Sequence, residues 1–517
     1  MPTTIDNLLS RMTLEEKIGQ MILASIEVSR MDAGTREFLR KNHIGNVILF
    51  GKNCAGRAAL AQLNAEIQHT VMAENGLPAL IAIDQEGGCV TRLRSEATVF
   101  PSAMVIARTG DPANAYKVGR MMGGELRALG INLDCAPVLD TLSGPAERRY
   151  YGQTVQSIAD YGCAMARGLR DAGVLACGKH FPGHGDTDTD SHIGLPRVDK
   201  SREQLEECEL LPFRRAIEAG IPAIMSSHVL FPALEPEKLP ATMSRRILTG
   251  LLREELGFGG VIISDCMEMD AIKKFYGTVN GVLAAMKAGV DLVFVSQTPA
   301  LAAEAMQNAR RAAENGELDL AELDVSVQRL LEAKAQCAAM QPKTLGDEAA
   351  CRARAEEVRA ASITAVHLPQ GGMPALGDNP LFLGCADYRS TIASNAESSG
   401  FTFPEEMRRH ADKGTALVTD KDPGDAEIAE VVSQAAAHSC IVLGTYNGHI
   451  LQGQLRLAKA LAATGLPMIL VALRNPYDLR NMPDHVAALA GWEYTRPLFD
   501  ALWPVLNGTA RPTGKLP

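Results

Sequence analysis

The chain of 517 residues is too long for one ordinary core, so a barrel of about 250 or more residues plus a second domain is expected. Apolar residues make up 46% and charged residues 22%, which is typical of folded globular proteins and excludes a disordered or membrane-embedded chain. The 61 acidic residues outnumber the 51 basic ones, which are not gathered into runs, so nucleic acid is not expected as a partner.

Residues 1–21 carry an amphipathic, partly charged helical pattern. The pattern lacks the basic start, apolar run and small-residue cleavage site of a secretory leader. The eleven cysteines are scattered and never form a Cys-x-x-Cys pair, so neither a disulfide framework nor a zinc ribbon is expected. No apolar stretch approaches the roughly 18 residues that a membrane span needs. Together these features predict a cytoplasmic protein with no membrane partner.

Short apolar segments alternate with helical patterns up to about residue 340, which is typical of repeated βα units. Eight of these segments are predicted to be strands: 21–25, 46–50, 79–84, 131–140, 174–181, 222–229, 260–265 and 291–296. Eight strands with intervening helices predict a (β/α)8 TIM-type barrel over residues 1–340. One of the helices is expected to begin at Ser201, within the segment 201–219.

The chain after the barrel begins with a polar, Ala-rich segment, which is interpreted as a linker over residues 341–360 that runs into a charged helix. Helical patterns such as 452–463 then alternate with five apolar segments: 381–384, 416–420, 440–446, 467–473 and 486–491. This alternation predicts a smaller, open α/β sandwich domain over residues 361–517.

Polar clusters follow five of the predicted barrel strands. The clusters are Asp84-Gln85-Glu86, Arg148-Arg149, Lys179 to His192, His228 and Asp265. In such barrels the loops at the carboxyl ends of the strands build the active site. Capping of a buried strand would explain any one cluster as well. Five clusters together indicate an active site.

The densest cluster, KHFPGHGDTDTDSH at 179–192, holds three His and three Asp. Calcium is excluded because an EF-hand would need Gly at Ser191 and Glu at Arg197. A transition-metal site formed by the three histidines is the less favoured interpretation. Pro182 and Gly183 break any helix between the first two histidines, and the segment contains no Cys.

Acid and base chemistry is the favoured interpretation of this segment. Asp190 and His192 are two positions apart, so on an extended loop their side chains lie on one side and can hydrogen-bond. A carboxylate bound to one ring nitrogen raises the basicity of the other. Asp265 ends an apolar run and would supply an acidic nucleophile, although capping of the next helix explains it equally well. Glu268 and Asp270 are expected to be surface or structural residues.

These residues lie within motifs that resemble family 3 glycoside hydrolases, in particular bacterial β-N-acetylglucosaminidases of the NagZ type. The motifs cover nearly the whole chain: MTLEEKIGQM (12–21), IDQEGG (83–88), APVLD (136–140), KHFPGHG with DSH (179–192), SSHV (226–229), LREELGFGGVIISD (252–265), VALRNPYDL (471–479) and GKLP (514–517). The resemblance implies a retaining enzyme that releases terminal β-linked N-acetylglucosamine from short glycans or cell-wall fragments through a covalent glycosyl-enzyme. It implies no metal and no organic cofactor.

The resemblance also assigns roles to individual residues. Asp265 is matched to the nucleophile and His192 to the acid and base, with Asp190 polarising His192. Four further residues would hold the sugar hydroxyls: Asp84, Arg149, Lys179 and His180. The proton donor would thus be a His in place of the second carboxylate that retaining hydrolases generally use. The chain departs from the family pattern at Cys89, where Arg is usual, and in the segment 141–152, which is shorter than usual.

Other functions remain open to the same residues. A phosphorylase would pass the glycosyl group to phosphate, since an imidazole repels an incoming anion less than a carboxylate does. A different β-linked sugar would also fit, because no motif for an acetamido pocket is readable. A binding protein without catalysis is disfavoured because the three matched catalytic residues are present. Trp492 and Trp503 both follow the predicted barrel, which favours a short substrate over a stacked polysaccharide.

Overall fold

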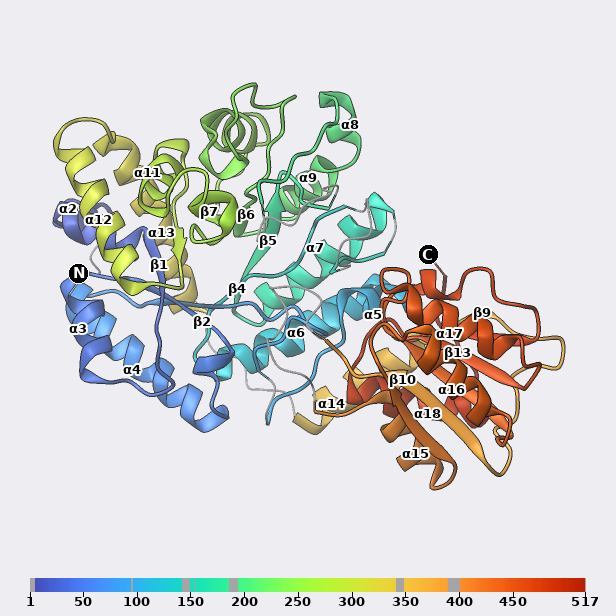
Figure 1. Cartoon of the computed structure of the whole chain (residues 1–517). Helices are drawn as coiled ribbons and strands as arrows, with labels where there is room; N and C mark the ends of the chain where they lie inside the picture. Colours follow the sequence, from blue (N-terminus) through green and yellow to red (C-terminus); the bar gives the residue numbers. More distant parts are fainter. Residues whose placement is uncertain are drawn as a thin grey trace.

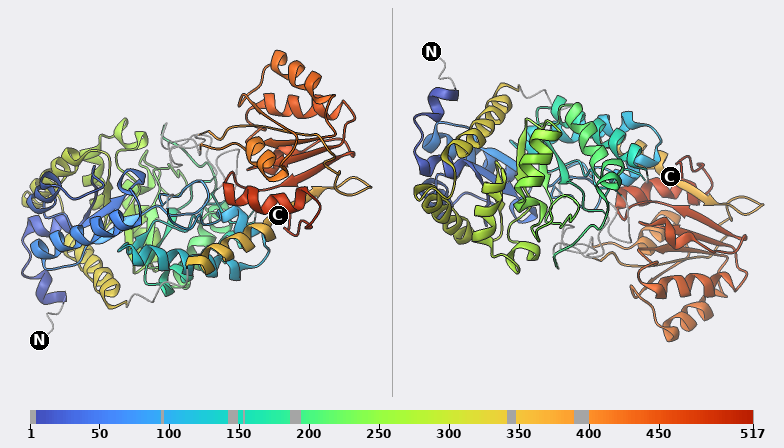
Figure 2. Two further views of the ribbon diagram at one scale, coloured as in Figure 1. Left: turned by 90° about the horizontal axis from the view of Figure 1, so that it is seen from below. Right: turned by 90° about the horizontal axis from the view of Figure 1, so that it is seen from above.

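The structure is a computed structural model that describes residues 5–93, 96–141, 149–152, 154–185, 194–340, 348–388 and 400–516. The chain folds into a (β/α)8 barrel and a second, smaller α/β domain, which lie side by side (Figures 1 and 2). The predicted fold class is therefore confirmed.

Eight parallel strands form the barrel wall. In sequence order they are β1 (Ile22–Ser25), β2 (Asn46–Leu49), β3 (Leu80–Ile83), β4 (Leu133–Asp134), β5 (Leu175–Phe181), β6 (Ala223–Ser226), β7 (Val261–Ser264) and β8 (Val293–Val295). Each lies within one of the eight apolar segments that predicted it. β8 pairs with β1, and a bridge between Ile263 and Leu292 closes the ring to β7. The strand residues are all buried because the packed interior and the outer helices cover both faces.

The fourth strand is shorter than the predicted segment 131–140. Its regular ladder ends at Asp134, and Pro137 has no N–H to extend it. Hydrogen bonds nevertheless continue beyond Pro137, where the backbone N of Leu139 donates to the carbonyl of Lys179 at 2.6 Å. The segment therefore still delivers Asp140 to the carboxyl end of the barrel, beside β5.

Helices cover the outside of the barrel. They are α1 (Ile5–Leu9), α2 (Leu14–Gln20), α3 (Ala33–Lys41), α4 (Arg57–Asn75), α5 (Ala103–Arg108), α6 (Pro112–Ala128), α7 (Val155–Asp171), α8 (Arg202–Glu207), α9 (Leu210–Glu218), the π-helix η3 (Arg246–Glu255), α10 (Asp270–Lys273), α11 (Thr278–Ala288), α12 (Pro299–Glu314) and α13 (Leu320–Ala339). Ser201 caps α8 as predicted, but the segment 201–219 forms two helices, because Pro212 lacks the N–H that would bond to residue 208. None of the helices in the described part of the chain combines the length and the apolar character needed to cross a bilayer.

The second domain is built on a six-stranded sheet in the order β11-β10-β12-β13-β14-β9. Its strands are β9 (Thr364–His367), β10 (Pro380–Cys385), β11 (Thr415–Thr419), β12 (Cys440–Thr445), β13 (Met468–Ala472) and β14 (Val486–Ala490). The five predicted strands are all present and parallel. β9 was not predicted, and it joins the edge of the sheet antiparallel to β14. The associated helices are α14 (Glu348–Ser362), α15 (Phe403–Ala411), α16 (Asp425–Ala435), α17 (Gln452–Ala462) and α18 (Arg496–Leu506).

The two domains meet along α14, which packs against both α5 of the barrel and α18 of the second domain (Figure 1). A buried ion pair joins α14 to the segment that follows β14: Arg359 Nε donates to the carboxylate of Glu493 at 2.6 Å, and the two side chains are 1% and 4% exposed. The last residues return to the barrel, where the backbone N of Lys515 donates to the carbonyl of Arg108 at 2.9 Å. Glu493 follows β14 and binds Ser102, and Arg474 follows β13 and contacts Cys89, so the carboxyl edge of the second sheet lies against the barrel.

Candidate active site

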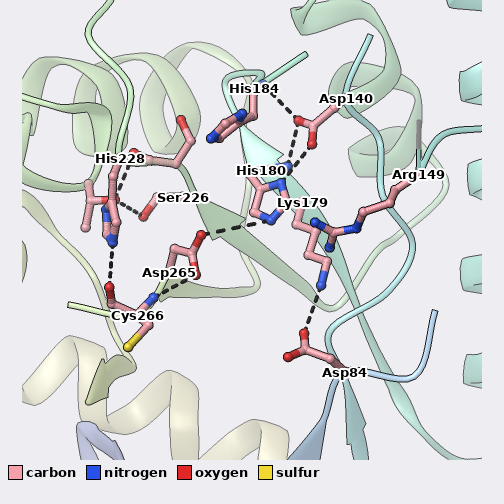
Figure 3. A network of polar contacts seen from close by, with 12 residues as sticks. Asp84, Asp140, Arg149, Lys179, His180, His184, Ser226, His228, Asp265 and Cys266 are labelled. Carbon is pink, nitrogen blue, oxygen red and sulfur yellow. Dashed lines mark hydrogen bonds and ion pairs between the residues drawn. The ribbon is translucent and has the colours of Figure 1, made fainter. Parts of the chain in front are cut away.

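The polar residues at the carboxyl ends of the barrel strands face one another (Figure 3). Asp84 directly follows β3, Lys179 and His180 lie in β5, and Asp265 directly follows β7. Arg149 reaches the same place from the loop after β4 (Figure 3). The structure thus brings together five of the seven residues that the sequence singled out.

Lys179 lies between two carboxylates. Its Nζ is 2.9 Å from Oδ1 of Asp84 and 2.7 Å from Oε1 of Glu86, and the side chain is 2% exposed. Arg149 binds the same Glu86 with two guanidinium nitrogens, of which Nε donates to Oε2 at 2.8 Å. Glu86 stood in the cluster after the third strand, but the sequence gave it no role of its own. It connects Arg149 to Lys179 and therefore organises this half of the site.

The charges of this network keep one another ionised. Burial raises the pKa of Asp84, but Lys179 and Arg92 outweigh it and hold this pKa below its ordinary value. Burial likewise opposes ionisation of Glu86, and Arg149 and Lys179 lower its pKa overall. Burial lowers the pKa of Lys179, but the attraction of Asp84 and Glu86 outweighs burial and raises this pKa above its ordinary value. Such a fixed set of charged donors and acceptors is suited to holding sugar hydroxyls.

His180 is oriented by Asp140, a residue to which the sequence assigned no role. Its Nδ1 lies 2.8 Å from Oδ2 of Asp140, and the backbone N–H groups of His180 and His184 donate to Oδ1 at 3.0 and 2.9 Å. Burial raises the pKa of Asp140, but the imidazole and these hydrogen bonds lower it to about 2. An ionised carboxylate only accepts, so Nδ1 carries the proton and Nε2 is the ring atom that faces Asp265.

Asp265 is held at the end of β7 with one oxygen fixed. Its Oδ1 accepts the backbone N–H of Cys266 at 2.7 Å, and its Oδ2 lies 4.0 Å from Nε2 of His180 (Figure 3). The following helix, α10, begins only at Asp270 and has Met269 at its N-cap. Asp265 therefore does not cap that helix, which removes the structural alternative that the sequence had left open.

The turn that carries Asp265 is supported by His228. This buried imidazole bonds through Nε2 to the carbonyl of Cys266 at 2.9 Å and through Nδ1 to Oγ1 of Thr242 at 3.0 Å. Since a carbonyl only accepts, Nε2 of His228 is protonated. His228 belonged to the fourth polar cluster of the sequence. It fixes the backbone next to Asp265 and lies on the side of Asp265 away from His180 (Figure 3).

Glu268 and Asp270 were expected to be surface or structural residues, and each binds a partner elsewhere in the barrel. The buried carboxylate of Glu268 accepts the backbone N–H groups of Gln297 and Thr298 at 2.6 and 3.0 Å, at the start of α12. Asp270 pairs with Lys274 at 2.8 Å, one turn along the same segment. Glu268 and Asp270 bind partners at α12 and along their own segment, so Asp265 is the acidic group that this segment contributes to the site.

The acid and base pair of the sequence prediction, His192 with Asp190, lies outside the described residues, as do Asp186 and Asp188. Their roles stay predictions. Among the residues that the structure does describe, no group of three or more His, Cys, Asp and Glu side chains is arranged to hold a metal ion.

Comparison with known proteins agrees with this architecture. The profile of the Glycosyl hydrolase family 3 N terminal domain matches residues 13–333, a span that contains all eight barrel strands. The chain belongs to glycoside hydrolase family 3. This family 3 enzyme is 32% identical to β-hexosaminidase A of Pseudoalteromonas piscicida, over 93% of the chain and 90% of that relative. It is 36% identical to a β-hexosaminidase of Alkalilimnicola ehrlichii, over 54% of the chain and 81% of the relative.

The solved structures include a similar two-domain protein. A glycoside hydrolase family 3 β-N-acetylglucosaminidase from Paenibacillus sp. str. FPU-7 superposes with a TM-score of 0.90 at 37% identity, and the match covers 98% of both chains. The family 3 fold of this glycoside hydrolase therefore extends over both domains.

Proposed function

We propose that this family 3 glycoside hydrolase is a retaining exo-β-N-acetylglucosaminidase that releases terminal β-linked N-acetylglucosamine from short glycans or cell-wall fragments. The Paenibacillus relative is a β-N-acetylglucosaminidase, which supports the sugar, and the P. piscicida relative is a β-hexosaminidase, which supports the wider class of hexosamines. The observation that carries the proposal is the placement of Asp265, which presents Oδ2 toward His180 while Cys266 holds Oδ1. All eleven cysteines lie within the described residues and none forms a disulfide, which supports a reducing compartment, and we propose the cytoplasm.

In the first step Asp265 would act as the nucleophile. Its Oδ2 attacks the anomeric carbon from the face opposite the leaving group, and a covalent glycosyl-enzyme forms as the bond to the leaving oxygen breaks. The charged network of Asp84, Lys179 and Arg149 would hold the hydroxyls of the sugar. Nε2 of His180 would accept a hydrogen bond from a further hydroxyl. Fixing the sugar in this way brings the reacting atoms into line before the bond forms.

His192 would supply the proton transfers. As the glycosidic bond breaks, His192 gives its proton to the leaving oxygen, and Asp190 stabilises the imidazolium beforehand. In the second step a water molecule gives a proton to His192 and attacks the anomeric carbon, and the bond to Asp265 breaks. Two displacements at the same carbon restore the β configuration of the product.

The Asp265→Asn variant tests the proposal. Release of p-nitrophenol from the β-N-acetylglucosaminide is expected to fall by at least about a thousandfold, because a carboxamide is a poor nucleophile. A variant that keeps its activity would remove Asp265 from the reaction. The same assay with other nitrophenyl glycosides tests the sugar. Addition of phosphate separates the alternatives: a hydrolase releases N-acetylglucosamine, whereas a phosphorylase releases the sugar 1-phosphate.

A further inference from the structure

The loop that follows β3 carries Asp84, which is proposed to bind the sugar, and Glu86, which binds Lys179 and Arg149; this loop is folded onto a second barrel segment, 99–102. The backbone N of Gly88 donates to the carbonyl of Phe100 at 3.0 Å. Gly87 and Gly88 both have positive φ, and a Cβ on Gly88 would lie 2.5 Å from Cβ of Ser102. Only glycine fits there, so the position of Glu86 depends on where segment 99–102 lies.

Segment 99–102 is in turn held by the second domain. Oε2 of Glu493 accepts the backbone N–H of Ser102 at 2.9 Å, and the guanidinium of Arg359 donates to the carbonyl of Val99 at 2.7 Å. Arg359 and Glu493 are the buried ion pair of the domain junction. Oε2 of Glu493 also lies 3.6 Å from the place that a Cβ of Gly88 would take, so this carboxylate binds Ser102 and lies beside Gly88.

A second contact reaches the same loop from the next strand of the second sheet. Arg474 follows β13 and is buried, and its guanidinium lies 3.6 Å from Sγ of Cys89, three positions after Glu86. The other end of that guanidinium donates to Oη of Tyr446 at 2.8 Å. Cys89 was the position where the sequence departs from the family pattern, and the structure places an arginine of the second domain against it.

These contacts form one continuous path of packed and hydrogen-bonded groups. The path runs from the Arg359–Glu493 pair through Ser102 and Gly88 to Glu86, and from Glu86 to Lys179 and Arg149. We propose that Glu493 is a positioning residue for sugar binding: the second domain clamps the loop after β3 and thereby sets the geometry of the Glu86–Lys179–Arg149 network. The consequence for the sugar rests on the function proposed above, whereas the clamp itself does not.

Hydrogen exchange of the backbone amides tests the clamp without any substrate. In Glu493→Ala the amides of Glu86, Gly88 and Ser102 are expected to exchange at least about tenfold faster than in the unaltered protein, since local opening becomes easier when its contacts are removed. Leu461→Ala serves as the matched control, because Leu461 is buried in α17, which packs against α16 and β12 of the second domain. It lowers the stability of that domain and is expected to leave these amides unchanged. Unchanged exchange in Glu493→Ala would overturn the clamp.

Kinetics at a temperature well below unfolding test the consequence for the sugar. With the nitrophenyl β-N-acetylglucosaminide, Glu493→Ala is expected to raise KM by about tenfold or more, because a small displacement of the binding groups weakens every contact to the sugar. The isosteric Glu493→Gln keeps an oxygen for Ser102 and should raise KM less. A KM unchanged in both variants, or raised equally by Leu461→Ala, would overturn the positioning role. An unaltered protein that is inactive on every glycoside would instead refute the proposed function and leave the exchange result to decide the clamp.

Discussion

At the scale of single residues, the site is organised by carboxylates that do not react. Asp140 binds Nδ1 of His180 and two backbone N–H groups, and so fixes which nitrogen of the ring faces Asp265. Glu86 binds both Lys179 and Arg149, and so fixes the positions of these two cations. Both carboxylates were present in recognisable motifs of the sequence. Their roles were not predictable, because each depends on partners from a different strand, which only the folded barrel brings within hydrogen-bonding distance.

The acidity of Asp140 leads to a prediction about stability. Its pKa is about 2 in the folded protein against an ordinary value of 3.8, so the ionised group stabilises the fold above pH 3.8, and this stabilisation disappears as the pH falls towards 2. Asp140→Asn should therefore be less stable than the unaltered protein at pH 6. The gap between their free energies of unfolding should narrow by about 2 kcal/mol as the pH falls from 6 to 2. Urea unfolding at a series of pH values measures the gap. Asp199→Asn, which changes an exposed carboxylate, should show no such narrowing; a constant gap for Asp140→Asn would refute the assignment.

At the scale of elements, the barrel was predictable because each parallel strand is buried on both faces and so appears as an unbroken apolar run. β9 escaped prediction for the opposite reason: Thr364 to His367 is short, and three of its four residues are half-buried or exposed at the edge of a sheet. The break between α8 and α9 is explained by Pro212. The sequence pattern of 201–219 is amphipathic throughout, so periodicity alone does not reveal that break.

Glu268 tests whether a buried carboxylate near Asp265 serves the fold or the reaction. It binds two backbone N–H groups at the start of α12, so Glu268→Ala should destabilise the protein by about 3 kcal/mol by leaving both donors without an acceptor. Glu268→Gln retains an oxygen and should change stability by less than about 1 kcal/mol, with kcat within about twofold of the unaltered enzyme. Thermal unfolding and steady-state kinetics on both variants make the comparison. A Gln variant that melts normally but has lost its activity would show that Glu268 takes part in the chemistry.

At the scale of the whole molecule, a buried ion pair of the second domain supplies groups that bind the barrel: Glu493 accepts the backbone N–H of Ser102, and Arg359 donates to the carbonyl of Val99. Arg359→Met leaves the carboxylate of Glu493 buried without its cation, which should lower the stability of the junction by about 3 kcal/mol. Calorimetry is expected to show the domains of this variant unfolding in separate transitions. As a control, Glu322→Gln removes an exposed partner of Arg245 and should cost less than about 1 kcal/mol. If Arg359→Met and Glu322→Gln melt alike, the pair does not hold the domains together.

The two-domain architecture was readable from alternating strands and helices, but the junction was not. No local pattern marks Arg359, Glu493 or Arg474 as contacts of the barrel, because each lies in an ordinary helix or strand end and meets its partner more than 130 positions away. The family motif that contains Arg474 indicated only that the second domain belongs with the barrel. How the second domain acts on the sugar site required the three-dimensional structure.

The proposed mechanism requires a covalent bond between Asp265 and N-acetylglucosamine during turnover. It is tested most directly by trapping the intermediate with a slow fluorinated N-acetylglucosaminyl fluoride, followed by mass spectrometry of the intact protein and of its peptides. The proposed mechanism predicts one added sugar per chain, located on the peptide that contains Asp265, with no label on Asp265→Asn. A label on another residue, or turnover of the reagent with inversion and no covalent adduct, would contradict it.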